Sequence, residues 1–278
     1  MINKFPVNKW EISDKAAALH REACICDMTL PWVPEADGKN EALKRFQASG
    51  FDFLSLSVGV ERMGLSHTVR YVLAMRDEFR SKPDQFRFIE TVQDIREAKT
   101  NGQLAIGFHF QGSEMLERDV RLVELFYCLG VRHMLIAKDY RSRAADGCYE
   151  KSNAGLSQYG ESLIREMNRV GMVLDLTHTG YKSTMEAMEI SSAPVFFSHS
   201  NPYGVLAQTR NIKDERSKAV QNLVVLLASL GLVIFSKIIT SPHRVCLKIS
   251  IMWLSLLARG TLGWGSTMYI IPICLCAR

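Results

Sequence analysis

GMVLDLTH (residues 171–178) and APVFFSHS (residues 193–200) are two apolar runs that each lead to a histidine, His178 and His199. A short apolar run bounded by small residues is typical of a strand whose two faces are both covered, as in a parallel sheet. The segment between them, GYKSTMEAMEISS, has the spacing of a helix. Together they predict one strand–helix–strand repeat that places its two histidines at equivalent points.

The same pattern recurs upstream. Further strands are expected at ACICDM (23–28), FDFLSLSVG (51–59), QLAIGFHF (103–110) and RHMLIA (132–137), and further helices at DVRLVELFYCLG (119–130) and LSQYGESLIREMNRVG (156–171). Such repeats predict a parallel sheet with helices outside it, either a barrel or a doubly wound sheet. No G-x-G-x-x-G follows the first strand, which counts against a dinucleotide fold. The predicted fold is α/β, a TIM-like (β/α)8 barrel.

The two histidines have a geometric consequence in such a barrel. Active-site groups of these folds lie at the carboxyl ends of the strands. Neighbouring strands are about 4.8 Å apart, so the imidazoles of His178 and His199 are expected to face one mouth. Two neutral imidazoles there suit zinc or a similar divalent cation. The alternative is two core or loop histidines satisfied by backbone hydrogen bonds.

Composition narrows the functional class. The chain has 278 residues, of which 47% are hydrophobic, and a formal net charge of +5. Residues 1–215 carry 27 Lys and Arg against 29 Asp and Glu, whereas residues 216–278 carry seven basic residues and no acidic one. The surplus of positive charge therefore reflects the absence of acidic residues in the tail. Since the sequence also has no basic–aromatic platform, we do not expect nucleic-acid binding. Seven cysteines at irregular spacing and the absence of an apolar leader predict a cytoplasmic protein.

The stretch from Gly155 to Asn211 closely resembles the renal (membrane) dipeptidase family of metallopeptidases. The elements that carry the resemblance are GLSQYG, EMNRVGMVLDLTH, PVFFSHSN and TRN. A weaker resemblance runs upstream through GVRHMLIA, IGFHFQG and CDMTLPW, so that it covers roughly residues 20–215.

The resemblance implies a TIM-barrel-like fold and a zinc-dependent hydrolase that cleaves the amide bond of dipeptides with a metal-activated hydroxide. Family enzymes hold two zinc ions. By position, His178 and His199 match the two histidine ligands of one zinc, and Arg210 matches the arginine that holds the substrate and its tetrahedral intermediate. A small dipeptide is the implied substrate. The oligomeric state stays open, a homodimer included.

Other positions depart from the family pattern. Where the family has H-x-D before Leu-Pro, this chain has Asp27 and Thr29, and threonine is a poor substitute for a carboxylate ligand. The bridging glutamate of the family falls on Gln111, and its substrate-contacting histidine falls on Lys138, a predicted catalytic residue whose charge can still stabilise an oxyanion. One metal held by His178 and His199, with Gln111 or Asp27, is therefore expected.

Three further residues are candidates for a role at the site. His109 shares a strand face with Gln111 and is a candidate additional ligand. Asp175, which precedes the histidine in the family as well, is expected to support the site rather than ligate the metal. Glu114 is another acidic group near in sequence.

The tail changes character after about residue 220. Its longest uncharged apolar stretch, Leu223–Ser236, has 14 residues, short of the ~20 that span a bilayer, so no membrane anchor is expected. Reading codons across residue boundaries, Ile249–Trp253 permits Ile-Asp-Tyr-Val in another frame, and Gly260–Tyr269 permits x-His-Val-Gly-Leu-Gly-x-Asp-x-Val. These runs are similar to the family segments H-I-D-Y-V and G-x-x-H-V-G-L-G-x-D-Y that the tail lacks. We interpret residues 1–220 as the barrel domain, with about six βα units, and residues 221–278 as a frameshifted, aberrant tail. The barrel is then incomplete at its C-terminal end.

Three functional hypotheses remain at this stage: a zinc-dependent dipeptidase, a catalytically impaired or inactive relative, and a different metal-dependent amide or lactone hydrolase. His178, His199 and Arg210 favour the first or third. Thr29, Gln111 and Lys138 favour the second.

Overall fold

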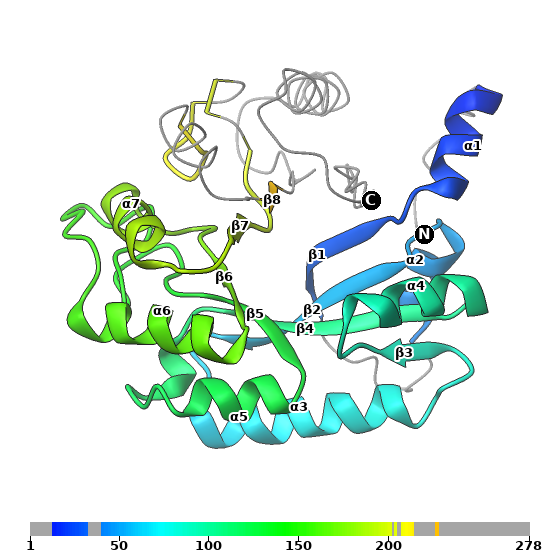
Figure 1. Ribbon diagram of the computed structural model, residues 1–278, viewed down its shortest axis with the longest axis horizontal. Helices are drawn as coiled ribbons and strands as arrows, with labels where there is room; N and C mark the ends of the chain where they lie inside the picture. The colour runs from blue at the N-terminus through cyan, green and yellow to red at the C-terminus, as the bar shows by residue number, and fades with distance from the viewer. Residues whose placement is uncertain (1–12, 33–39, 202, 205–206, 214–225, 228–278) are drawn as a thin grey trace, which may run out of the picture.

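The computed structural model describes residues 13–32, 40–201, 203–204, 207–213 and 226–227 (Figure 1). The strands are β1 (Cys26–Pro31), β2 (Phe53–Val60), β3 (Phe86–Phe88), β4 (Leu104–Gln111), β5 (Val131–Leu135), β6 (Val173–Asp175), β7 (Val195–Phe197) and β8 (Leu226–Leu227). The helices are α1 (Asp14–Glu22), α2 (Glu41–Ala48), α3 (Leu65–Arg80), α4 (Val92–Asn101), α5 (Leu122–Cys128), α6 (Gln158–Val170) and α7 (Tyr181–Ile190), with a 3₁₀ turn η1 at Glu114–Leu116.

All strand pairs are parallel, and the main path of the sheet runs β1-β2-β4-β5-β6-β7-β8. The central strand β4 pairs along one edge with β2. Its other edge is shared, because β3 pairs with Leu104–Ile106 and β5 pairs with Phe108–Phe110. In the described part of the chain β1 and β8 are the two ends of the sheet rather than neighbours. The fold is therefore an α/β half-barrel, an incomplete form of the TIM-like barrel that the sequence predicts.

The helices cover the outside of this curved sheet. Helix α3 contacts β2 and β3, α4 contacts β3 and β4, α5 contacts β5, and α6 contacts β6. Figure 1 shows α3, α5 and α6 side by side below the strands. Strand β4 explains the two layers: Phe108 and Phe110 pack against the helix-borne rings of Phe79 and Phe126. The alternate residues His109 and Gln111 consequently face the interior of the half-barrel.

The predicted strands and helices are observed, and α1, α2, α3, α4, β3 and β8 are found in addition. Each of the six predicted strands and three predicted helices overlaps an observed element. Strand β3 is an addition, because FRF is too short to give a pattern of its own and forms only where β4 offers an edge. The two predicted strands that contain His178 and His199 extend too far at their carboxyl ends. The observed strands end at Asp175 and Phe197, and both histidines lie in turns.

The predicted domain boundary at residue 220 stays a prediction. Strand β8 lies beyond it and pairs with β7 through Phe196 and Phe197. Apart from β8, the predicted tail lies outside the described residues. Within the described residues, no helix combines the length and the apolar character needed to cross a membrane.

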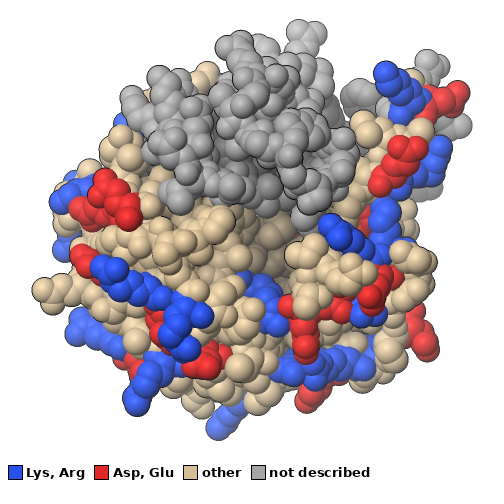
Figure 2. Space-filling view, in the orientation of Figure 1, with Lys and Arg blue, Asp and Glu red and all other residues tan. Residues whose placement is uncertain are grey.

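Charge on the outer surface is mixed. Figure 2 shows basic and acidic side chains interspersed over the visible part of the described helices, with no large area of one sign. Several of these side chains form exposed ion pairs, such as Arg169 with Glu124 and Arg80 with Glu90. On this face, the described residues offer no basic patch for a polyanion.

Candidate metal centre

Residues from widely separated parts of the chain meet at the carboxyl ends of the strands. His178 follows β6 and His199 follows β7, and their Nε2 atoms lie 3.1 Å apart. Two nitrogen ligands of one tetrahedral zinc, each about 2.0–2.1 Å from the ion, are separated by roughly 3.3 Å. The spacing that the sequence predicts for a shared cation is therefore present.

The hydrogen bonding of His178 determines which nitrogen is available. Its Nδ1 lies 2.7 Å from the Oδ1 of Asp139, at the end of the β5 strand. Because a carboxylate accepts hydrogen bonds, Nδ1 carries the proton, and Nε2 presents its lone pair as an acceptor. A carboxylate that fixes the tautomer in this way is the usual support of a metal-binding histidine. The His178 side chain holds the pKa of Asp139 below its ordinary value.

The hydroxyl of Thr29 performs the same task for His199. Thr29 Oγ1 donates its single hydrogen to the carbonyl of Met28 at 2.7 Å, so it accepts from His199 Nδ1 at 3.1 Å. Ser198 Oγ lies 2.6 Å from the same nitrogen. His199 is therefore also protonated at Nδ1 and directs its Nε2 lone pair at that of His178. Thr29 therefore orients the ring of His199, although its hydroxyl does not supply the negative charge of a carboxylate.

This donor set fits a divalent cation. Two lone pairs that face each other at 3.1 Å repel, and the guanidinium of Arg210 lies against that of His178. A divalent cation bound between the two nitrogens would remove this repulsion for both. Burial lowers the pKa of both His178 and His199, and the positive charge of Arg210 acts in the same direction, so protonation is not the favoured solution. The neutral imidazoles are thus in the form that zinc binds.

Arg210 contacts both histidines. Its Nη2 donates to His178 Nε2 at 3.1 Å and to the His199 carbonyl at 3.0 Å. Its Nε is buried and has no hydrogen-bond partner among the described residues. A guanidinium with an unused donor beside the paired imidazoles is suited to an anionic oxygen.

Gln111 ends β4 and Lys138 follows β5, whereas Asp27 is the second residue of β1, in register with Leu54 near the start of β2. Asp27 accepts from the backbone N–H of Thr29 through Oδ1, and its buried Oδ2 has no partner among the described residues. Burial raises the pKa of Asp27. Among the described residues, the acids, histidines and cysteines form no group in which Asp27 joins both histidines with all ligand atoms within 4.8 Å. Gln111 donates through Nε2 to Ser57 Oγ at 2.9 Å.

Lys138 follows β5 and is half-buried. Its backbone N–H donates to Glu61 Oε1 at 2.7 Å, and the charge of its side chain acts on His178 and Asp139. The roles predicted for Lys138, Gln111 and Asp27 stay predictions.

His109 and Asp175 have structural partners. Both nitrogens of His109 are engaged, Nδ1 with Ser55 Oγ at 3.0 Å and Nε2 with Ser57 Oγ at 2.7 Å. In this arrangement His109 has no nitrogen left for a metal. Asp175 Oδ1 accepts from the backbone N–H groups of Thr177 and Ser198, so it ties together the two turns that carry the histidines.

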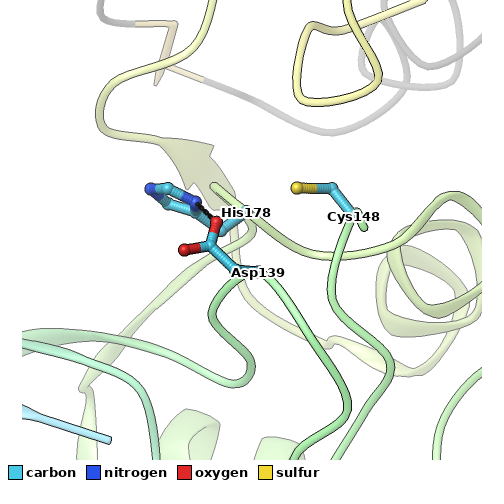
Figure 3. A group of neighbouring side chains, drawn as sticks. All are labelled: Asp139, Cys148 and His178. Carbon is cyan, nitrogen blue, oxygen red and sulfur yellow. Dashed lines mark hydrogen bonds and ion pairs between the residues drawn. The ribbon is translucent and has the colours of Figure 1, made fainter. Parts of the chain in front are cut away.

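Asp139, Cys148 and Glu61 lie near the centre and were not predicted from the sequence. Asp139, Cys148 and His178 place one ligand atom each within 4.8 Å of one another, and Figure 3 shows their side chains converging. Glu61, directly after β2, has its pKa raised to about 7, chiefly by burial. Asp139 directly follows the predicted site residue Lys138, and Glu61 lies just after the predicted strand at residues 51–59. Their positions in the sequence could have indicated that they lie near the site. Cys148 had none, because it lies in an irregular loop.

Comparison of the sequence with known proteins identifies its family. Residues 43–242 match the family model described as membrane dipeptidase, peptidase family M19. The chain belongs to this family. The prediction made from the motifs between Gly155 and Asn211 is therefore confirmed.

Individual members of the membrane dipeptidase family give the extent of the likeness. An uncharacterized dipeptidase of Schizosaccharomyces pombe is 30% identical over 137 residues, which are 48% of this chain and 33% of that protein. Dipeptidase tcpJ of Claviceps purpurea is 31% identical over 133 residues, or 47% of this chain and 31% of that protein. The matches thus span about a third of the length of these curated relatives.

Solved structures extend the comparison to the fold. An amidohydrolase from Pseudomonas aeruginosa superposes with a TM-score of 0.70 at 29% identity, covering 77% of this chain and 64% of that chain. A metallopeptidase from Rhodobacter sphaeroides, liganded with a phosphinate mimic of the dipeptide L-Ala-D-Ala, superposes with a TM-score of 0.72 at 18% identity, covering 90% of this chain and 88% of that chain. The half-barrel of this family member is therefore an M19-type fold.

Proposed function

We propose that this protein is a zinc-dependent dipeptidase that hydrolyses the amide bond of a small dipeptide. The observation that carries the proposal is the pair of Nε2 atoms 3.1 Å apart, each with its Nδ1 proton directed at an acceptor. Membership of the membrane dipeptidase family supports the substrate class. The dipeptide mimic bound to the Rhodobacter sphaeroides relative is of that class.

His178 and His199 would hold the cation, and the buried Oδ2 of Asp27, which has no hydrogen-bond partner among the described residues, is the carboxylate of the predicted ligand set. A zinc ion in such a site lowers the pKa of bound water toward ~7 and polarises the carbonyl under attack. Gln111 is a neutral amide bonded to Ser57, and the Thr29 hydroxyl is used by Met28 and His199. We therefore propose one zinc ion for this chain.

Arg210 and Lys138 would supply the positive charge for the substrate. Arg210 keeps its guanidinium beside both histidines and retains an unused Nε donor, so it is suited to hold the oxyanion that develops on the carbonyl. Lys138 lies half-buried at the same edge and would stabilise the same charge electrostatically. The proposal also includes a cytoplasmic location and a homodimer, and both rest on the sequence alone.

Zinc content and dipeptide hydrolysis, measured on the full chain, test the proposal. We expect one zinc per chain and turnover of a dipeptide panel that includes substrates with a D-residue in second place. His178→Ala removes one ligand, so zinc affinity should fall at least about 100-fold and turnover should disappear. His67→Ala, which changes an exposed histidine on α3, is the matched control and should leave both unchanged. Wild-type turnover that survives His178→Ala would contradict the proposal.

A second candidate is a relative that binds the metal without catalysis. The bond from Gln111 to Ser57 favours it, because that side chain supplies no charge where the family has a carboxylate. Stoichiometric zinc binding that is lost in His178→Ala, together with no turnover of any dipeptide, would select this candidate over the dipeptidase.

A further inference from the structure

The imidazole of His178 has polar groups against both of its nitrogens. Nε2 faces His199 and Arg210, as described above. On the other side, Nδ1 lies 2.7 Å from Asp139 Oδ1, and Cys148 completes a group whose ligand atoms are all within 4.8 Å of one another. Figure 3 shows the Cys148 sulfur and the Asp139 carboxylate on the side of the ring that carries the bonded nitrogen.

The main chain holds these three residues together. The N–H of Cys148 donates to the carbonyl of His178 at 2.7 Å, and the N–H of Tyr149 donates to the carbonyl of Asp139 at 2.7 Å. Asp139 and His178 both have left-handed backbones, with φ of 64° and 65°. Such conformations are costly for residues other than glycine and persist where the surroundings enforce them. The convergence of the three side chains is therefore fixed by the backbone.

The donor set is that of a thiophilic divalent cation. A thiolate, an imidazole and a carboxylate are ligands of zinc, and soft cations such as Cd²⁺ are favoured by the sulfur. Tetrahedral zinc with these ligands has donor atoms roughly 3.3–3.7 Å apart, so side-chain adjustments within the 4.8 Å group suffice. Asp139 and an ionised Cys148 would balance the two positive charges of the ion, which lowers the cost of burying it.

We propose that Asp139, Cys148 and His178 form a second cation site, and that filling it switches off the site between His178 and His199. Binding releases the thiol proton of Cys148 to solvent as the sulfur–metal bond forms. The cation takes the place of the proton on His178 Nδ1, and the neutral ring carries its proton on Nε2 instead. The hydrogen bond from Arg210 to Nε2 then breaks, and the new Nε2–H donates to His199 Nε2. Because a neutral imidazole has one lone pair, His178 can then no longer join His199 in holding an ion. A thiophilic cation at this site is thus an inhibitor.

The inhibitory consequence rests on the proposed function, whereas cation binding by the three residues does not. Both parts are tested with Cd²⁺ on the metal-free full chain, read by the near-ultraviolet charge-transfer absorption of a sulfur–cadmium bond. We expect this absorption to saturate in the wild type and to be lost in Cys148→Ser. Cys128→Ser, which changes an exposed cysteine on α5, is the matched control and should keep it.

Two further variants separate the sites. His199→Ala removes the paired imidazoles, so hydrolysis should be lost while the cadmium absorption remains. Asp139→Asn keeps the thiol and the fold, so the absorption should remain but the Cd²⁺ affinity should fall at least about 10-fold. In hydrolysis assays, Cd²⁺ should inhibit the wild type, and Cys148→Ser should relieve that inhibition.

The outcomes distinguish the two proposals. Equal cadmium absorption in wild type and Cys148→Ser, with circular dichroism spectra that match, would overturn the second site. If the cadmium absorption were lost in His199→Ala, Cys148 would bind the same cation as His199. The proposal that the two cation sites exclude each other would then be overturned. A wild type without dipeptide hydrolysis but with a Cys148-dependent absorption would refute the dipeptidase and leave the second cation site standing.

Discussion

At the scale of single residues, the position of one proton decides what each histidine can do. Asp139 keeps the proton of His178 on Nδ1, and Thr29 keeps that of His199 on Nδ1. A threonine in place of a carboxylate therefore loses a potential ligand but retains a positioning function. Because a neutral imidazole has one lone pair, His178 would bind a cation either through Nε2 or through Nδ1, but not through both at once.

Glu61 lies directly after β2, and its Oε1 accepts from the backbone N–H of Lys138 at 2.7 Å. Burial raises its pKa to about 7, and the backbone hydrogen bond from Lys138 partly opposes the increase. A carboxyl whose pKa is raised on folding stabilises the protein below its unfolded pKa. That contribution is lost as the pH rises through the folded value.

Glu61→Gln should therefore raise the melting temperature relative to the wild type at about pH 8 and not at about pH 4.5, because glutamine keeps the acceptor and does not ionise. Thermal unfolding at both pH values measures this difference. Glu189→Gln, at an exposed position of α7, is the control for the loss of one negative charge. The same difference between wild type and Glu61→Gln at both pH values would refute the assignment.

At the scale of elements, the loop between β5 and α6 positions most of the residues that sequence reasoning missed. Its end is fixed where Ser157, the N-cap of α6, accepts from Gly160 N–H and donates its own N–H to the Ala144 carbonyl. A Cβ on Gly160 would lie 2.1 Å from that carbonyl oxygen. The absence of a side chain thus lets the helix start directly against the loop.

Gly160→Ala should destabilise the protein by about 1–3 kcal/mol, since overpacking against backbone outweighs the better helix propensity of alanine. Urea unfolding of the metal-free chain measures the change. Gly204→Ala, where an added Cβ meets nothing within 4 Å, should stay within about 0.5 kcal/mol of the wild type. Equal midpoints for Gly160→Ala and the wild type would show that the contact is not maintained.

At the scale of the whole molecule, the interior of the half-barrel is polar where the outer layer is apolar. His109 is fully buried, binds the hydroxyls of Ser55 and Ser57, and stacks on His133 with ring centroids 4.6 Å apart. Its pKa lies well below the ordinary value, first because of burial and then because of His133. The folded protein therefore keeps His109 neutral under conditions in which the unfolded chain would protonate it.

The free energy of unfolding should accordingly fall as the pH decreases below about 6.5, because the unfolded chain then binds protons that the folded protein excludes. Urea unfolding of the metal-free chain at about pH 7.5 and about pH 5.5 measures the decrease. His109→Asn should show a smaller decrease, whereas His67→Asn, at the exposed α3 position, should behave as the wild type. If the free energy of unfolding decreased equally in the wild type, His109→Asn and His67→Asn, His109 would not contribute to the pH dependence of stability.

The sequence by itself determined the α/β class, the parallel order of its units, the family and the pairing of His178 with His199. These features follow from short-range patterns: apolar runs, helical spacing, and motifs that keep their order along the chain. Strand length was predicted less well, because both histidines belong to turns that begin once the sheet pairing ends.

Only the tertiary structure decided the surroundings of those histidines. Asp139, Cys148 and Glu61 come from irregular segments after β5 and β2, where no periodicity predicts position. Thr29 lies 170 residues from His199 in sequence, yet its hydroxyl sets the tautomer of that ring. Tautomers, burial and unpaired oxygens depend on which groups meet across strands, and that information exists only once the sheet has brought the strand ends together.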